Sequence, residues 1–205
     1  MITTGCPKPT YMASAVTSLN PCPSEFGQIQ KFIFWRRGNK IASIATALIA
    51  TTWTTLLTAT GNTKAIVTSF VVGKVTPGEA RESGGGNESI DGIPTVVGLN
   101  PSVFEGYIKQ QKQDVIKSLK KLAAETLDVL LINENGAFKY LDTQYNGVGT
   151  GVYGIPVNGL SIGDLEFGDF DGEDRNKIKF YMPANWSDNS EISADTAFAL
   201  TLVNS

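Results

Sequence analysis

Six carboxylates gather in one short stretch of the sequence, which makes it the strongest candidate for chemistry: Asp164, Glu166, Asp169, Asp171, Glu173 and Asp174. Ca²⁺ takes about six to eight oxygen ligands, so such a stretch could bind it. The spacing does not match an EF-hand, because no bidentate Glu follows Gly172 at the required distance. Two of these carboxylates could also supply the acid and base of a hydrolase, but the spacing selects no pair. We favour an ordinary acidic turn between two strands.

The sequence contains no histidine and has two cysteines, Cys6 and Cys22, among 205 residues. Histidine is the commonest metal ligand and the usual general base near neutral pH, so Ser-His-Asp and Cys-His mechanisms are excluded for this chain. Two cysteines alone do not complete a structural zinc site. We expect two free thiols, although an oxidising compartment would permit a disulfide. We therefore expect a protein that is not an enzyme, and we assign no catalytic, cofactor-binding or metal-binding residues and no cofactor.

Aromatic side chains offer another way to bind a ligand, since five of them could line a sugar-binding groove: Trp35, Trp53, Trp186, Tyr145 and Tyr153. Trp35 and Trp53 lie in strongly periodic segments, which favours a place in the core. Trp186 lies in a turn, where we expect it to be exposed. One exposed tryptophan is a weak signal for a carbohydrate-binding protein.

The charge balance restricts the possible partners. The net charge is −3, and charged residues make up 18% of the chain, below the value of about 25% that is typical of soluble domains. This balance argues against a dedicated nucleic-acid binder, because duplex binding depends on Lys and Arg. It is compatible with a protein that encloses DNA passively.

Neither a secretion signal nor a membrane span is expected. The opening residues lack a basic region followed by an apolar core. Residues 41–60 are the candidate span, but they carry seven threonines and a serine, which makes them too polar for a typical membrane helix.

The N-terminal part of the chain divides into an irregular arm and the start of a domain. Residues 1–24 contain four prolines, which break regular structure, so we expect an N-terminal arm followed by a single domain over 25–205. Residues 26–36 alternate and are rich in aromatic and β-branched side chains, which predicts a strand. Residues 51–61 predict a short helix capped by Thr51 or Thr52, with Trp53 on its buried face and Gly61 at its C-terminal end. Residues 64–72 are again typical of a strand.

A glycine-rich segment follows over residues 73–94. Three successive glycines, Gly84 to Gly86, give the backbone great freedom. A phosphate-binding loop would require a helix with Lys and Ser or Thr after the glycines, and none is predicted here. We expect a flexible loop or the tip of a long hairpin.

One long amphipathic helix is expected from about Ser102 to Thr126. Val115, Ile116 and Leu119 belong to an apolar stripe at helical spacing. Five lysines lie opposite it: Lys109, Lys112, Lys117, Lys120 and Lys121. They could bind nucleic acid, phosphate or an acidic partner, but we favour a solvated helix face.

The remainder of the chain predicts strands. Residues 128–133 form an apolar strand, the Asn133–Gly136 segment suits a type I′ hairpin turn, and residues 137–141 form the partner strand. Further strands are expected at residues 160–162, 165–167, 177–182 and 197–203. Together these elements predict an α+β fold, an antiparallel β-sandwich or sheet with one long flanking amphipathic helix.

Four segments give the sequence a family resemblance: Phe26–Lys31, Trp53–Lys64, Pro77–Arg81 with its triple glycine, and Phe180–Ser187. In these segments it resembles virion structural proteins of tailed bacteriophages of Bacteroidetes hosts, the crAss-like group included. The resemblance implies a tail or neck component, a ring- or tube-forming subunit with a β-sandwich, a flanking helix and loops that reach adjacent subunits. The family brings no catalytic residues.

The sequence thus leads to an expected structural role. We expect a homo-oligomeric ring or tube subunit in the virion, assembled in the host cytoplasm, with other tail, neck or head-tail connector proteins as partners. Ring subunits meet through heterologous interfaces, for which a proline-rich arm and a glycine-rich loop are suited. The alternative is an extracellular or virion-surface carbohydrate-binding module with its site near Trp186 and the acidic stretch.

Overall fold

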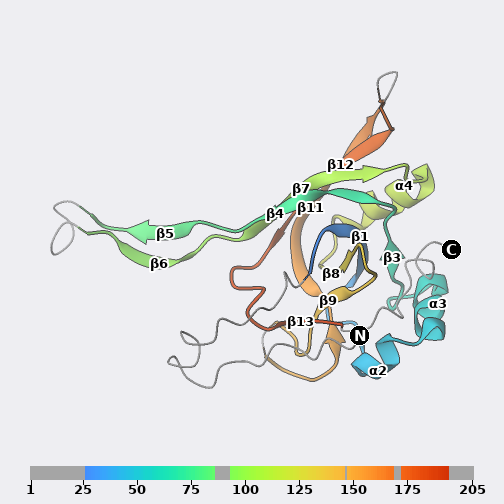
Figure 1. Cartoon of the computed structure of the whole chain (residues 1–205), viewed down its shortest axis with the longest axis horizontal. Coiled ribbons are helices and arrows are strands. Elements are labelled where there is room, and N and C mark those ends of the chain that lie inside the picture. Colours follow the sequence, from blue (N-terminus) through green and yellow to red (C-terminus); the bar gives the residue numbers. More distant parts are fainter. Residues whose placement is uncertain (1–25, 86–92, 146, 169–171, 194–205) are drawn as a thin grey trace.

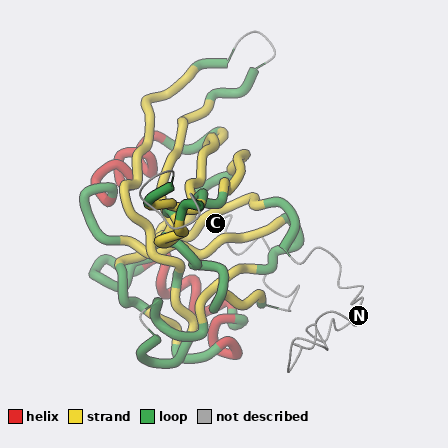
Figure 2. Tube along the Cα trace, turned by 90° about the vertical axis from the view of Figure 1, so that its left-hand side faces the viewer, coloured by secondary structure: helices red, strands yellow, loops and turns green. Residues whose placement is uncertain are grey.

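The computed structural model describes residues 26–85, 93–145, 147–168 and 172–193. The expected N-terminal arm with its two cysteines and the strand expected at 197–203 lie outside these residues. The described chain is mostly antiparallel β-sheet with a few short helices (Figure 1; Figure 2). The expectation of a β-rich fold built on an antiparallel sheet is confirmed.

The strands follow one another as β1 (Ile29–Arg36), β2 (Lys40–Ile41), β3 (Ile66–Val67), β4 (Val71–Thr76), β5 (Ala80–Ser83), β6 (Thr95–Leu99), β7 (Ser102–Lys109), β8 (Leu127–Asn133), β9 (Phe138–Leu141), β10 (Val152–Tyr153), β11 (Ile155–Glu166), β12 (Arg175–Met182) and β13 (Ser190–Ile192). The helices are α2 (Ile44–Ala47), α3 (Ala50–Thr58) and α4 (Gln113–Leu122).

The described strands form one large sheet and one separate hairpin. The large sheet has eleven strands and runs in the order β2-β10-β9-β8-β11-β12-β7-β4. Off this path, β1 pairs with β8, β3 pairs with β1, and β13 pairs with β9. The sheet curves so far that β4 contacts β1. The separate hairpin consists of β5 and β6. A sandwich of two sheets is not what the described residues show.

Strands β1 and β8 lie at the centre because apolar side chains cover both of their faces. Their pairing is antiparallel and brings Ile33 opposite Leu130. Successive side chains of a strand point to opposite faces, so Phe32 and Phe34 enter one apolar cluster while Ile33 and Trp35 enter another. A strand that is buried on both faces becomes a continuous apolar run, as residues 129–132 are.

The first cluster lies between β1 and the β7–β12 part of the sheet. Phe32 packs edge-on against Phe104 and Phe180, with ring centroids 4.8 and 5.3 Å apart. Helix α4 covers this cluster with Ile116 and Leu119, both buried.

The second cluster lies under the short helices α2 and α3. The indole rings of Trp35 and Trp53 are stacked with centroids 6.2 Å apart, and Phe138 packs edge-on against Trp53. Trp53 Nε1 donates a hydrogen bond of 2.6 Å to the carbonyl of Ala47, which satisfies the buried indole N–H. The prediction that both tryptophans lie in the core is therefore confirmed.

Several elements lie where the sequence predicts them. They are β1, α3, the β8–β9 hairpin, and the strands at residues 160–162, 165–166 and 177–182, which belong to β11 and β12. Two local details were wrong. Helix α3 begins after Ile49 without a side-chain cap, and its C-cap is Ala59 rather than Gly61. The β8–β9 turn has one positive φ, at Gly136, so it is not the type I′ turn, which needs two.

The prediction of one long helix from Ser102 to Thr126 was wrong. Its first third is strand β7, in which buried and more exposed residues alternate, and its helical part is the ten-residue α4. Phe104 and Ile108 fit both a helical and an alternating pattern, and strand pairing of β7 with β4 and β12 on its two sides decides between them. Gln110, with φ 51°, lies between the end of β7 and the start of α4, where the backbone changes from strand to helix.

The segment of residues 73–94 was expected to be a flexible loop or the tip of a long hairpin. Its beginning belongs to β4 and its middle to β5, so the alternative of a long hairpin is the one observed. Gly84 and Gly85 lie just after β5, and residues 86–92 lie outside the described residues. Among the helices that the structure describes, none is long and apolar enough to span a membrane.

Candidate functional site

The β5–β6 hairpin projects from the body as a two-stranded arm (Figure 1). Ala80 pairs with Leu99 and Glu82 with Val96 in an antiparallel ladder. At the base of the arm, the amide of Asn100 donates a hydrogen bond of 2.9 Å to the carbonyl of Glu79. Because β4 leads into β5 and β6 leads into β7, the arm continues the β4–β7 pair beyond the body.

Proline and glycine residues at the base explain why the arm separates from the main sheet. Pro77 and Pro101 lack the amide donor that a continued ladder requires. The two strands also approach each other closely there, and a side chain at Gly78 would collide with the backbone of Asn100. Further out, Val97 bulges from the ladder between Val96 and Gly98, which increases the local twist.

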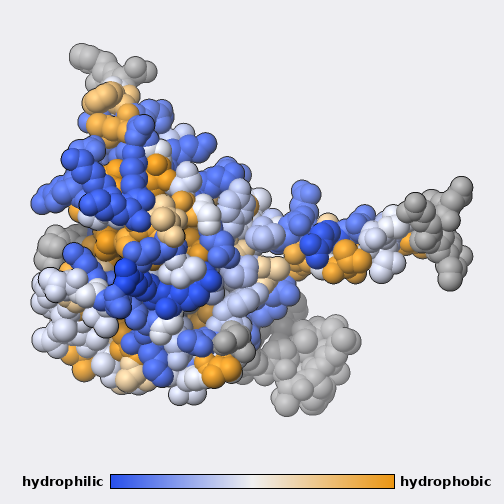
Figure 3. Space-filling model, turned by 180° about the vertical axis from the view of Figure 1, so that it is seen from behind, coloured by the Kyte–Doolittle hydropathy of each residue, from blue (hydrophilic) through white to orange (hydrophobic). Residues whose placement is uncertain are grey.

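Apolar side chains of the arm face solvent. Ile93, Val96, Val97 and Leu99 are 67, 57, 52 and 44% exposed. Figure 3 shows apolar patches among polar residues along the arm. A hairpin of two strands has no core of its own and is marginally stable in water, and exposed apolar patches mark interaction sites. The arm therefore has the properties of a surface that a partner covers.

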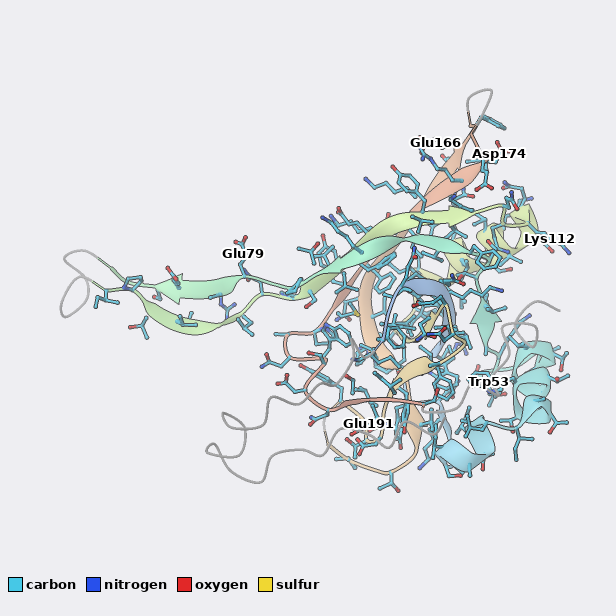
Figure 4. The ribbon with its side chains drawn as sticks, in the orientation of Figure 1. Trp53, Glu79, Lys112, Glu166, Asp174 and Glu191 are labelled. Atoms are coloured by element: carbon cyan, nitrogen blue, oxygen red, sulfur yellow. The ribbon has the colours of Figure 1, made fainter. Side chains whose placement is uncertain are left out.

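Charged residues accompany this apolar strip. Glu79, Arg81 and Glu82 are exposed on the opposing strand β5 and its N-terminal flank, and Glu79 is seen near the base of the arm in Figure 4. Their mixed signs suit a contact in which charge fixes the register and apolar burial supplies the affinity.

These arm residues were not predicted, because residues 73–94 were interpreted as one segment and no element was assigned to residues 95–99. A usable signal was present. The segment Thr95–Leu99 is β-branched, lies between Pro94 and Asn100-Pro101, and could have been recognised as a strand.

The structure separates most of the acidic residues and pairs them with cations. The carboxylate of Asp164 binds Lys120, Glu166 binds Arg175 at 2.8 Å, and Glu173 binds Lys109 at 2.9 Å. Asp174 accepts a hydrogen bond of 3.4 Å from the amide of Gly168. Glu166 and Asp174 lie at the projecting end of β11 and β12 in Figure 4. Asp169 and Asp171 lie outside the described residues.

These ion pairs determine the electrostatics of the acidic stretch. The hydrogen bond from Lys120 lowers the pKa of Asp164, and the hydrogen bond from Arg175 lowers the pKa of Glu166. Within the described residues no three His, Cys, Asp or Glu side chains lie close enough together to hold a metal ion. The described residues of this stretch lie at the end of β11 and just before β12, and ion pairs connect them to neighbouring strands and to α4.

The five aromatic residues considered for a sugar groove do not line a common groove on the described surface, and Trp35 stacks on Trp53 in the core. Trp35, Trp53 and Tyr153 are buried. Trp186 is half-buried, with Lys139 Nζ 5.6 Å from its ring centroid, and Tyr145 donates a hydrogen bond of 2.9 Å to the carbonyl of Ala184.

The five lysines expected on one helix lie on two elements. Lys112, Lys117, Lys120 and Lys121 are exposed at the start of α4 and along it, as the solvated-face interpretation predicts. Lys109 instead belongs to strand β7.

Comparison with known proteins yields little. No family model and no curated protein matches the chain. Among solved structures, the chain is similar to one described as "Tail of empty GTA particle computed with helical refinement, C6 symmetry". The two share 14% identity and a TM-score of 0.32, over 56% of this chain and 75% of that chain. We infer neither a shared fold nor a shared function from a likeness of this size.

Proposed function

We propose that this chain is a structural subunit of a bacteriophage virion. It forms an oligomeric ring or tube in the tail or neck region through contacts of its β5–β6 arm with neighbouring subunits. The observation that carries the proposal is the β5–β6 arm, a two-stranded projection with four exposed apolar side chains. The sequence resemblance to virion structural proteins of tailed phages supports the virion setting.

The shape of the subunit supports a repeated contact. An arm on one side of a body reaches a surface that differs from itself, which is a heterologous contact. Such contacts close into a ring when the rotation between subunits is a whole fraction of a turn, and otherwise continue into a helical tube. Covering the four apolar side chains stabilises the arm by removing their surface from water.

We also propose which proteins this subunit contacts and where it assembles. The ring or tube joins other tail or neck proteins, encloses DNA, and assembles in the host cytoplasm before it becomes part of the virion. The subunit has a structural role and catalyses no reaction.

The test compares the wild-type chain with an arm variant, Val96→Lys with Leu99→Lys. We expect the wild-type chain to form symmetric rings or tubes, seen by negative-stain microscopy and by mass in solution. The arm variant is expected to stay monomeric, because two ammonium groups cannot be buried in an apolar contact without a large desolvation cost.

A control variant, Ile49→Lys with Val148→Lys, changes two exposed apolar residues that lie away from the arm. It should assemble like the wild-type chain. Assembly of the arm variant would contradict the role of the arm. A wild-type chain that stays monomeric at every concentration, and that binds glycans, would instead favour the carbohydrate-binding module.

A further inference from the structure

The outward face of β4, β7 and β12 carries a regular set of charged and aromatic side chains. Strand pairing places Lys74, Glu105 and Lys179 in one row across the three strands. The adjacent row consists of Val72, Tyr107 and Lys177. Residues two apart on β12 lie ~6.7 Å from one another, and neighbouring strands lie ~4.8 Å apart, so both rows form one continuous surface.

Positive charge exceeds negative charge on this face. Its cations are Lys74, Lys109, Arg175, Lys177 and Lys179, and its carboxylates are Glu105, Glu166 and Glu173. Each carboxylate is paired: Glu105 with Lys179 at 2.5 Å, Glu166 with Arg175, and Glu173 with Lys109. Lys74 and Lys177 make no salt bridge with any described residue, so they carry the surplus of two positive charges.

Three lysines interact electrostatically with the carboxylate of Glu105. Its hydrogen bond with Lys179 lowers the pKa of this carboxyl group, and the charges of Lys177 and Lys74 lower the pKa further. A single carboxylate among three ammonium groups leaves the site positive. This surplus stands out in a chain whose net charge is −3.

Two tyrosines lie among the cations. The guanidinium carbon of Arg175 lies 4.4 Å from the ring centroid of Tyr107, and Lys179 Nζ lies 5.5 Å from that of Tyr181. Cation–π contact orients these cations over the rings. Tyrosine hydroxyl groups also donate hydrogen bonds to phosphate oxygens.

We propose that this basic face, formed by Lys74, Tyr107, Arg175, Lys177, Lys179 and Tyr181, binds nucleic acid through its phosphate backbone. A duplex carries one negative charge per about 1.7 Å of axis, so it offers phosphates to cations that are spaced as widely as adjacent strands and rows of a sheet. The contact is independent of sequence, because no residue of the face is arranged to read base edges. It goes beyond the passive enclosure of DNA in the proposed function and does not require assembly.

The lysines of α4 are the rival surface in the same molecule. Lys112, Lys117 and Lys121 are exposed and basic, but they occupy a helix face with Asp114 and with Lys120 already paired to Asp164. The described part of α4 presents no aromatic residue beside them. We therefore favour the sheet over the helix.

The test uses the full chain and a fluorescently labelled duplex DNA of mixed sequence, with binding followed by anisotropy over a series of salt concentrations. The face variant is Lys74→Gln with Lys177→Gln, and the control variant is Lys117→Gln with Lys121→Gln. Both lower the net charge by two, so a difference between them reports position rather than total charge.

We expect the face variant to bind about tenfold more weakly than the wild-type chain at low salt. The slope of log K against log salt concentration should fall in magnitude by about two, one unit for each lost phosphate contact. The control variant should retain the wild-type affinity and slope.

Three results would overturn the proposal: equal weakening in both variants, weakening in the control variant alone, or no salt-dependent binding by the wild-type chain. Displacement of the duplex by an equal charge of poly-glutamate would assign the face to an acidic protein instead. Equal thermal midpoints for the variants and the wild-type chain are the check on folding. An arm variant without added charge, Val96→Ser with Leu99→Ser, should still bind DNA as a monomer, which separates this proposal from the assembly.

Discussion

Asp128 is a carboxylate that lies almost completely buried on the central strand β8. It is 4% exposed, and its oxygens accept hydrogen bonds from Arg37 Nε at 3.3 Å and from the amide of Gly38 at 3.1 Å. Burial raises the pKa of Asp128, and these two contacts offset only part of that effect. The native state therefore holds the proton of this residue more tightly than the unfolded chain does.

This balance predicts a pH dependence of stability. A raised native pKa means that the native state binds more protons than the unfolded state between the ordinary value of 3.8 and the raised value. The free energy of unfolding then falls as pH rises through that window and is level above it. Urea denaturation of the wild-type chain and of Asp128→Asn at several pH values should show this fall as the difference between them. Asp188→Asn, at an exposed turn position, controls for the loss of one charge, and a difference of opposite slope would mean that Arg37 and Gly38 outweigh burial.

At the scale of the element, β4 and β7 approach each other closely where two glycines face one another. Gly73 pairs with Gly106, and the ring of Phe104 lies over both. A methyl group on Gly106 would lie 2.8 Å from the Cα of Gly73 and would also press on the carbonyl of Val72. The pair therefore leaves no room for a side chain on the inner face of the sheet.

Gly106→Ala is expected to lower the free energy of unfolding by about 1–3 kcal/mol, because the backbone of β4 must shift to admit the methyl group. Gly61→Ala is the matched control, since a methyl group there meets nothing within 4 Å, and its effect should stay within about 0.5 kcal/mol. Chemical denaturation measures both. An equal effect of the two substitutions would show that β4 and β7 separate at no cost.

Local patterns explain which elements could be predicted from the sequence. The segments that form β1, β8 and α3 each have a strong hydrophobic pattern of their own, and these elements were predicted from the sequence. The β7 segment was mistaken for helix because Phe104 and Ile108 fit two periods, and pairing with strands distant in sequence decides between them. The glycine-rich segment could be predicted as a device for contact between subunits, whereas the exposure of Val96 and Leu99 could not, because it depends on what packs over the β5–β6 pair.

At the scale of the whole molecule, an arm that is covered by a neighbouring subunit couples stability to concentration. Association stabilises the native state by mass action, so the thermal midpoint of an associating protein rises with protein concentration. We expect this rise for the wild-type chain and a constant midpoint for Val96→Lys with Leu99→Lys, measured by calorimetry over a wide range of concentrations. A constant midpoint for both proteins would contradict coverage of the arm in solution.

The pairing of β1 with β8 also determines the order in which the chain can fold during synthesis. Ile33 pairs with Leu130, almost a hundred residues later, whereas Ala80 and Leu99 of the arm are about twenty residues apart. Pairing over a long stretch of chain is slow, and it cannot begin until the second strand has left the ribosome. The arm can therefore form while β1 still lacks its partner β8, and the central sheet is completed only after β13 emerges. The surface for meeting other subunits is thus available before the body that must carry it, so a nascent chain has to be kept apart from its neighbours until its last strands are made.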